Sequence, residues 1–120
     1  MHNDTVFHNW LVGYLSSRFS KDYTEIGVNP EGEDNEEFNG HFPDLILKNH
    51  GMVMAVVEVE TEGSINEERG SYWKDISGKG AKLIIMVPDN QKAKVTDLLW
   101  KNGIMQNVSV GSYGLKISMP

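Results

Sequence analysis

The apolar positions near the start of the chain have the spacing of an amphipathic helix. The residues on its apolar face are Val6, Phe7, Trp10, Leu11, Tyr14 and Leu15. Asp4 or Thr5 can cap this helix at its start. We expect the helix to pack against the rest of the protein through Trp10, Leu11 and Tyr14.

The rest of the chain alternates between strand-like and helix-like patterns. Short apolar runs predict strands at 22–28, 43–47, 52–61 and 81–87, and one or two more strands within 107–119. Longer periodic segments predict helices at 64–76 and 90–102, the first with a capping box formed by Ser64 and Glu67. The acidic segment 29–41 has no apolar periodicity and is expected to be a loop. All three tryptophans fall in helical patterns and are expected in the core.

Composition indicates a single globular domain that spans residues 1–120. Of the 120 residues, 39% are hydrophobic and 23% are charged. The absence of cysteine excludes disulfides and thiolate metal sites, and it fits a reducing, cytoplasmic compartment. No apolar run reaches the length of a membrane span, and the N-terminus lacks the basic region of a signal peptide. We therefore expect a cytoplasmic protein without a membrane anchor.

Two glutamates lie at the end of the most apolar strand. Alternate residues of a strand share a face, and both faces of 52–61 are mostly apolar, which predicts a central strand covered on both sides. Glu58 and Glu60 share one face near the carboxyl end, where open α/β sheets commonly place their sites. Buried glutamate is rare unless it is paired or binds something, so both are candidate site residues.

Asp44 reaches the same face as Glu58 in only one of two hairpin registers. A two-residue turn would place the two carboxylates on opposite faces of the sheet. A three-residue turn over 49–51 would pair Lys48 with Met52 and make Asp44 a diagonal neighbour of Glu58, about 7–8 Å away. The glycine at the third turn position favours the second register because that residue adopts the left-handed conformation. We therefore expect the two carboxylates to be close enough to share a divalent ion.

This arrangement of motifs resembles the PD-(D/E)XK nuclease superfamily. The chain carries Pro43-Asp44, then thirteen residues, then Glu58-Val59-Glu60. The predicted order of helix, three strands, helix and strand is similar to the αβββαβ core of the restriction-endonuclease-like fold. The motif "EVET" followed by a helix that contains "YWK" also resembles small uncharacterised members. The resemblance implies an α/β fold with a mixed central sheet flanked by helices.

The resemblance also implies roles for individual residues. Asp44, Glu58 and the carbonyl group of Val59 would bind Mg²⁺ or Mn²⁺, and a metal-bound water would attack a phosphodiester. The third motif position is normally a lysine, but here it is Glu60, as in some restriction enzymes of this fold. Glu60 could accept the proton of the water or bind a second ion. Lys74, in the following helix, could supply the missing positive charge.

Each candidate also has an ordinary structural interpretation. Asp44 follows a proline and can begin a turn, Glu60 can cap or solvate the start of a helix, and Lys74 can be a surface lysine. The four histidines show no metal-ligand spacing. His41 lies three residues before Asp44 and could approach the site, but a place in a solvated loop is the better explanation.

Charge bears on the choice between two functions. With 17 acidic and 11 basic residues the net charge is −6, whereas affinity for nucleic acid comes mainly from lysine and arginine. Binding of DNA or RNA would therefore need a local basic surface or a partner. Small members of this superfamily often act as dimers, so the resemblance implies a homodimer that could form a basic groove. The two hypotheses are a Mg²⁺-dependent nuclease and a nuclease-like fold that has lost catalysis and serves as a binding or assembly module.

Overall fold

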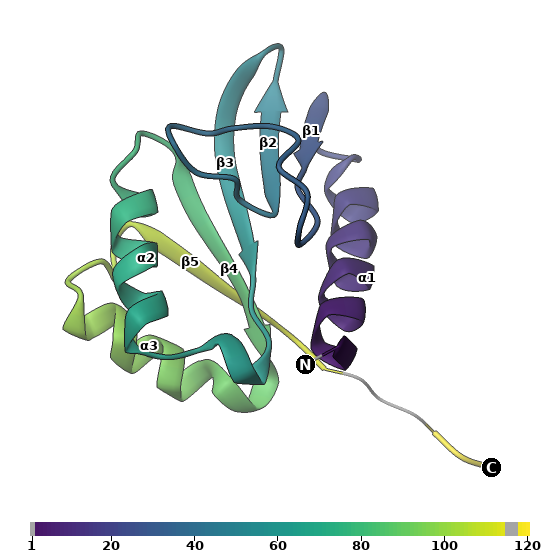
Figure 1. Cartoon of the computed structure of the whole chain (residues 1–120), viewed down its shortest axis with the longest axis vertical. Helices are drawn as coiled ribbons and strands as arrows, with labels where there is room; N and C mark the ends of the chain where they lie inside the picture. The colour runs from purple at the N-terminus through teal and green to yellow at the C-terminus, as the bar shows by residue number, and fades with distance from the viewer. Residues whose placement is uncertain (1, 115–117) are drawn as a thin grey trace.

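The computed structural model describes residues 2–114 and 118–120, and it leaves the side chains of residues 2 and 3 undescribed. Its helices and strands follow one another as α1 (His2–Phe19), β1 (Glu25–Val28), β2 (Leu45–Asn49), β3 (Met52–Val59), α2 (Glu67–Ser77), β4 (Lys82–Pro88), α3 (Lys92–Lys101) and β5 (Val108–Tyr113) (Figure 1). Short 3₁₀ turns at Glu62–Ser64 and Asp89–Gln91 precede α2 and α3. The predicted element order is confirmed, and a further expected strand near the C-terminus falls partly on residues 115–117, outside the described residues.

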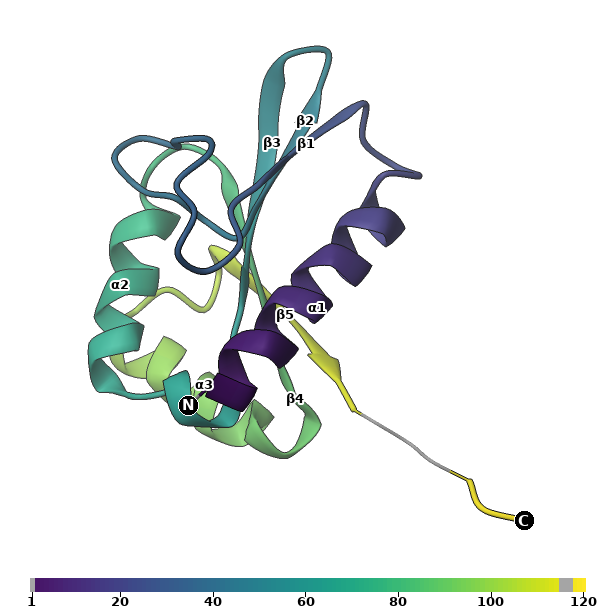
Figure 2. The same ribbon diagram turned by 45° about the vertical axis from the view of Figure 1, so that its right-hand side comes forward.

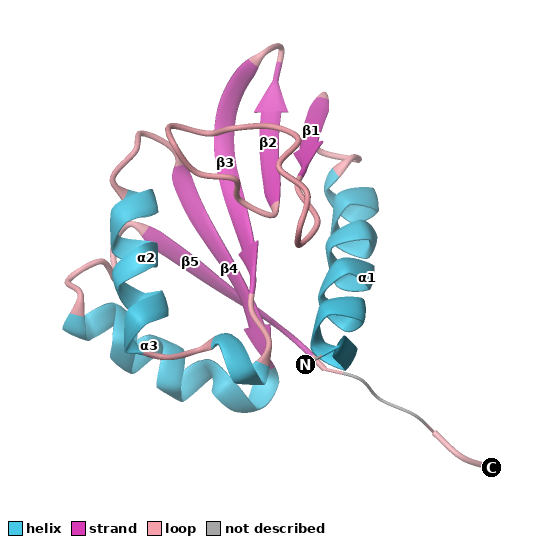
Figure 3. Ribbon diagram, in the orientation of Figure 1, coloured by secondary structure: helices cyan, strands magenta, loops and turns pink. Residues whose placement is uncertain are grey.

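The five strands form one mixed sheet in the order β1-β2-β3-β4-β5 (Figure 3). The first three strands are antiparallel neighbours, and β3, β4 and β5 run parallel to one another. The crossovers through α2 and α3 join the parallel strands, as parallel neighbours require. The predicted α/β class with a mixed sheet and flanking helices is confirmed. The carboxyl ends of β3, β4 and β5 meet at one edge of the sheet, next to the start of β2.

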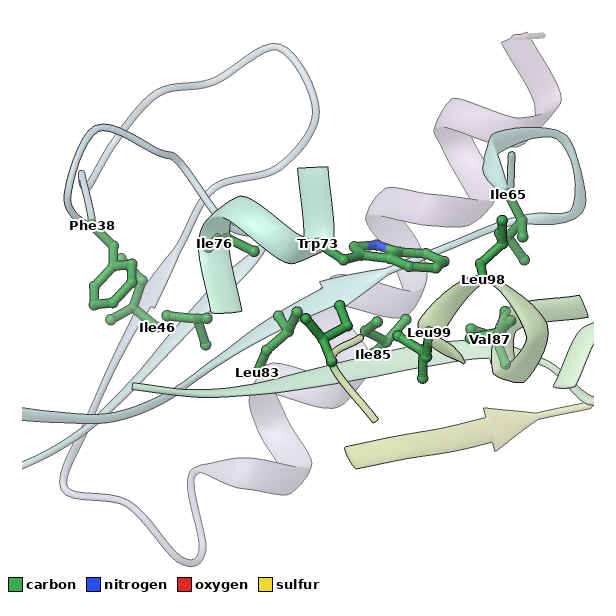
Figure 4. Packing of buried hydrophobic residues seen from close by; sticks show 13 residues of the cluster. Phe38, Ile46, Ile65, Trp73, Ile76, Leu83, Ile85, Val87, Leu98 and Leu99 are labelled. Atoms are coloured by element: carbon green, nitrogen blue, oxygen red, sulfur yellow. The ribbon is translucent and has the colours of Figure 1, made fainter. Parts of the chain in front are cut away.

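Helices cover both faces of the sheet, with α1 on one face and α2 and α3 on the other (Figure 2). The α1 face buries Leu11, Val12, Leu15, Leu45, Leu47, Ala55, Val57 and Val59. The other face buries a larger cluster, in which Trp73 and Ile76 of α2 face Leu83 and Ile85 of β4 (Figure 4). β3 is therefore the two-sided central strand that its apolar pattern predicted.

The expected packing of α1 is only partly right. Leu11 is buried as predicted, but Trp10 and Tyr14 are 60% and 45% exposed. The expectation that all three tryptophans lie in the core is also wrong, because only Trp73 is buried and Trp100 is 69% exposed. The helix turns its smaller aliphatic side chains towards the sheet, and its aromatic side chains remain at the surface.

The helix α2 begins later than its sequence pattern predicted. Its N-cap is Asn66, whose side-chain Oδ1 accepts a hydrogen bond from the backbone N–H of Arg69 at 2.8 Å. Ser64 belongs instead to the preceding 3₁₀ turn, where its Oγ accepts from the backbone N–H of Thr61 at 3.0 Å. The later start is relevant to function, because it places Arg69 in the first turn of α2, beside the end of β3.

The hairpin between β2 and β3 has a register that neither sequence alternative described. The turn contains two residues, His50 and Gly51, with positive φ angles of 50° and 80°, as a primed hairpin turn requires. Asn49 pairs with Met52, so the predicted pairing of Lys48 with Met52 is wrong. This short turn alone would place Asp44 and Glu58 on opposite faces.

A β-bulge in β3 returns Asp44 and Glu58 to the same face of the sheet. Between Lys48 and Leu47 the register shifts, because Lys48 pairs with Val53 while Leu47 pairs with Ala55. Met54 is the additional residue on β3, and a strand with one additional residue reverses which side chains face each side. Beyond the bulge Leu45 pairs with Val57. Asp44, the residue before Leu45, therefore lies opposite Glu58, the residue after Val57. The two carboxylates therefore share a face, as expected, although for a different reason.

The acidic segment between β1 and β2 is a loop, as predicted, and one asparagine holds it in place. Asn29 is buried, and its Nδ2 donates hydrogen bonds to the carbonyl oxygens of Glu36 and Pro43, both at 2.8 Å. Its Oδ1 accepts from the backbone N–H groups of Asn35 and Glu36, both at 2.8 Å. These bonds fix the loop over the sheet edge where β2 begins. Within the described residues, no helix has both the length and the apolar character that a membrane span requires.

Candidate functional site: an acidic pocket at the carboxyl end of β3

Asp44 and Glu58 come together at the carboxyl end of β3. Asp44 immediately precedes β2, and its Oδ2 accepts a hydrogen bond from the backbone N–H of Val59 at 2.7 Å. Asp44 and Glu58 are 8% and 2% exposed. The backbone contact to β3 keeps the Asp44 carboxylate beside Glu58, where two negative charges repel each other.

The Glu60 carboxylate is bound to an arginine that sequence reasoning did not assign to the site. Nε of Arg69 donates to both oxygens of Glu60, at 3.0 and 2.9 Å, and Nη2 of Arg69 donates to Oε1 of Glu58 at 3.3 Å. Trp73 Nε1 and Ser64 Oγ also donate to Glu60, at 3.1 and 2.7 Å. Glu60 is therefore fully paired inside the protein, and its oxygens are not free to bind a second ion or to accept a proton from water without rearrangement.

Tyr72 completes the environment of Glu58. Its hydroxyl donates a hydrogen bond to Oε2 of Glu58, and the guanidinium of Arg69 lies 4.3 Å from the centre of its ring. Burial raises the pKa of Glu58 well above its ordinary value, and the charge of Asp44 raises it further, while Arg69 and Tyr72 oppose the increase. The Glu58 side chain therefore retains its proton to a higher pH than an ordinary glutamate.

His8 reaches the pocket from α1 and binds Asp44. Its Nε2 lies 3.1 Å from Oδ2 of Asp44, and its Nδ1 lies 3.0 Å from Oδ1 of Asn9. Burial lowers the pKa of His8, but the hydrogen bond and the charge of Asp44 outweigh it and raise the pKa to about 9. His8 is therefore cationic at neutral pH, and it orients the Asp44 carboxylate.

These side chains line a pocket of about 360 Å³, together with residues 30–34 of the acidic loop. In addition to the three carboxylates of the motif, Asp4, Glu31, Glu33 and Asp34 line the pocket. Its basic lining residues among those described are His8 and Arg69. The local electrostatics thus favour a cation over a phosphate, unless a bound cation first offsets the negative charge.

The structure brings together four of the five residues assigned to the site from the sequence. Asp44, Glu58, Val59 and Glu60 all line the pocket, whereas Lys74 is exposed on α2 and is not among the lining residues. The positive charge expected from Lys74 is instead present on Arg69, five residues earlier in α2. His41 is not among the lining residues: its Nε2 lies 2.7 Å from Oδ2 of Asp75, and its ring packs edge-on against Tyr72.

The pocket has a limited set of groups that fit a divalent ion. In the described part of the chain, no group of three or more His, Asp or Glu side chains is arranged to hold a metal. Val59 and His8 both bind Oδ2 of Asp44, but Oδ1 has no hydrogen-bond partner within residues 4–114 and 118–120. Oε1 of Glu58 has only the long contact to Arg69. Two carboxylates suffice for Mg²⁺, which keeps several waters and takes further ligands from a substrate phosphate.

The sequence contained a signal for Arg69 but little signal for His8. Arg69 lies on the same helical face as Ile65, Tyr72 and Ile76, and an arginine on an apolar face indicates a buried ion pair. The helical spacing of α1 alone does not distinguish a buried histidine from an exposed one.

Comparisons of the chain with models of protein families, with curated proteins and with solved structures found no match.

Proposed function

We propose that the acidic pocket binds a divalent cation through Asp44 and Glu58 and hydrolyses phosphodiester bonds of DNA or RNA. The observation that carries the proposal is the convergence of these two carboxylates at the carboxyl end of β3, with Oδ1 of Asp44 unpaired within the described residues. Mutual repulsion of the carboxylates and the raised pKa of Glu58 make this arrangement costly for folding alone. A bound cation would offset that cost.

The element order supports a restriction-endonuclease-like core. α1, β1, β2, β3, α2 and β4 follow the αβββαβ order that the resemblance implies, in a mixed sheet with helices on both faces. The pocket lies at the start of β2 and the end of β3, where the resemblance would place the site. These features support the proposal at the level of topology, and the chemistry depends on the side chains.

Each residue of the pocket would have its own role in hydrolysis. Asp44, Glu58 and the carbonyl oxygen of Val59 would hold Mg²⁺ or Mn²⁺, while His8 orients Asp44. When bound, the ion would lower the pKa of a water nucleophile and stabilise charge on the phosphate. Arg69 Nη1 has no partner within the described residues and could donate to a phosphate oxygen. Glu60 would position Arg69, because both of its oxygens are already paired.

A second candidate function is a binding or assembly module without catalysis. The observation that favours it is the pairing of Glu58 and Glu60 with Arg69, which places a guanidinium where a metal-dependent enzyme would need space. The acidic residues of the loop also repel a polyanionic substrate. In this case the carboxylates would serve to fix α2 on the end of β3.

The test combines thermal stability with cleavage. We would measure the melting temperature and the cleavage of single-stranded, duplex and branched DNA and of RNA, with Mg²⁺ or Mn²⁺. The proteins are the wild type, Asp44→Asn and the control Asp97→Asn, which makes the same change on the exposed face of α3. The nuclease proposal predicts cleavage and stabilisation by the ion, about 2.7 kcal/mol at a hundredfold excess over its dissociation constant. Both effects should be lost only in Asp44→Asn.

The other outcomes are equally informative. Stabilisation by the ion without cleavage of any substrate would favour the binding module with a structural cation. If a well-folded wild type shows neither effect at millimolar metal, the metal site is refuted and the ion-paired module is the better account.

A further inference from the structure

A row of aromatic side chains lies exposed along α1. The ring centres of Phe7 and Trp10 are 6.2 Å apart, and those of Trp10 and Tyr14 are 5.7 Å apart. Tyr113, at the end of β5, extends the row, with its ring 5.7 Å from Phe7. Trp10 is 60% exposed, and contiguous exposed apolar side chains of this kind mark interaction surfaces.

These rings form one side of a groove of about 680 Å³ between α1 and the turns that follow β3 and β4. Asp4, Glu62 and Asp89 also line the groove, and none of the described residues that line it is a lysine or arginine. The groove therefore combines exposed aromatic faces with carboxylates. We name it the aromatic groove.

We propose that the aromatic groove binds a segment of a partner protein that presents a lysine or arginine side chain beside an apolar side chain. Aromatic faces attract cations, and nearby carboxylates add to that attraction. The chain already makes one such contact, since the guanidinium carbon of Arg18 lies 5.9 Å from the ring centre of Tyr14. The apolar side chain of the partner would cover Trp10, which is the kind of residue that dominates binding energy at interfaces.

Charge complementarity distinguishes this occupant from two others. In a two-fold contact between copies of this chain, the carboxylates of one groove would face those of the other, and each copy carries a net charge of −6. A nucleic acid could stack its bases on the rings, but its phosphates would meet Asp4, Glu62 and Asp89 without a basic residue in the lining. A basic protein segment satisfies both features of the groove.

The aromatic groove is continuous with the acidic pocket. Asp4 and Thr61 line both, and the hydroxyl of Tyr113 donates to the carbonyl oxygen of Glu60 at 2.6 Å. A basic partner bound in the groove would therefore place positive charge beside the carboxylates of the pocket. Such docking requires no catalytic activity of the pocket.

Random short peptides displayed on phage provide a direct probe. Peptides selected on the wild type should be enriched in lysine or arginine next to leucine, phenylalanine or other apolar residues. Synthetic, fluorescently labelled copies should bind with an affinity that falls at least about tenfold in Trp10→Ala. The matched control is Trp100→Ala, which removes an exposed tryptophan from α3 and should leave the affinity unchanged. Circular dichroism would verify that both variants are folded.

A double variant tests the contribution of the carboxylates. Glu62→Gln with Asp89→Asn should weaken binding of the same peptides and make the remaining affinity less dependent on salt concentration. Selected peptides without basic residues, no enrichment at all, or affinity that Trp10→Ala leaves unchanged would overturn the proposal. Two further results would also overturn it, namely a dimer in sedimentation that Trp10→Ala abolishes, and binding of oligothymidine that Trp10→Ala abolishes.

Discussion

Arg69 is the residue whose removal should disturb the protein most. Its guanidinium binds Glu60 through Nε at 3.0 and 2.9 Å and Glu58 through Nη2 at 3.3 Å. The two glutamate side chains are 1% and 3% exposed, and the arginine side chain is 29% exposed. In Arg69→Met the two buried glutamates would remain without their cation, whereas the volume of the side chain would largely be kept.

The magnitude follows from the burial of these carboxylates. Removal of one partner from a buried ion pair costs about 3–5 kcal/mol, because the remaining charge is desolvated and unpaired. Since Arg69 is partly exposed, we expect a loss of about 3 kcal/mol in the free energy of unfolding. With a urea m-value of about 2 kcal/mol/M, the midpoint should fall by about 1.5 M. Arg69→Met/Glu60→Gln should recover most of this loss, since both members of the pair are then neutral.

Urea unfolding followed by circular dichroism at neutral pH, without divalent ions, measures these values. Arg18→Met is the matched control, because it removes an exposed arginine from α1 and should change the midpoint little. A loss below about 1 kcal/mol in Arg69→Met, or a double variant no more stable than the single one, would refute the reasoning that the buried pair holds α2 on β3.

Two further predictions concern the protonation of the pocket. Glu58→Gln should leave the free energy of unfolding without metal unchanged or higher, because burial and Asp44 raise the pKa of Glu58 and the amide removes that charge cost; a clear loss in urea unfolding at pH 8 would instead mark Glu58 as a structural residue. The stability of the wild type should fall by up to about 3 kcal/mol between pH 6.5 and 9, because His8 has a pKa raised from 6.5 to about 9, so its stabilisation is complete below 6.5 and is lost as the pH passes 9. Glu58, whose pKa is also raised, lowers the stability in the same direction from pH 4.5 upwards. His8→Gln should therefore remove only the part of the stability loss that occurs between pH 6.5 and 9. If that part is unchanged in the variant, the assignment to His8 is contradicted.

The strands of the sheet and the position of the carboxylates could be predicted from the sequence, because both depend on local, periodic patterns. The two apolar faces of β3 identified the central strand, and the position of Glu58 and Glu60 at its end identified the edge of the sheet where the pocket lies. The partners of these carboxylates depend on packing between distant elements. His8 lies 36 positions from Asp44 in the chain, and no periodicity in α1 indicates that the two side chains meet.

The orientation of α1 shows a different limit of sequence reasoning. Its apolar face is wide enough to be divided, with Leu11, Val12 and Leu15 against the sheet and Trp10 and Tyr14 at the surface. Hydropathy favours burial of the larger aromatic rings, so it predicted Trp10 in the core. Which half of a wide apolar face is buried depends on the shape of the opposing sheet, and the sequence pattern does not contain that shape.

The β-bulge at Met54 has a consequence for how distant relatives could be recognised. In a hairpin with a two-residue turn and no bulge, residues that face each other are separated by an even number of positions, whereas the thirteen positions between Asp44 and Glu58 are an odd number. The spacing of the two carboxylates therefore records whether the bulge is present. A chain that preserves the site and the two-residue turn can lengthen or shorten this hairpin only by two positions at a time, unless it also gains or loses a bulge. A search for relatives that requires thirteen positions between the two carboxylates would miss hairpins with another odd number of positions, although these also place both carboxylates on one face.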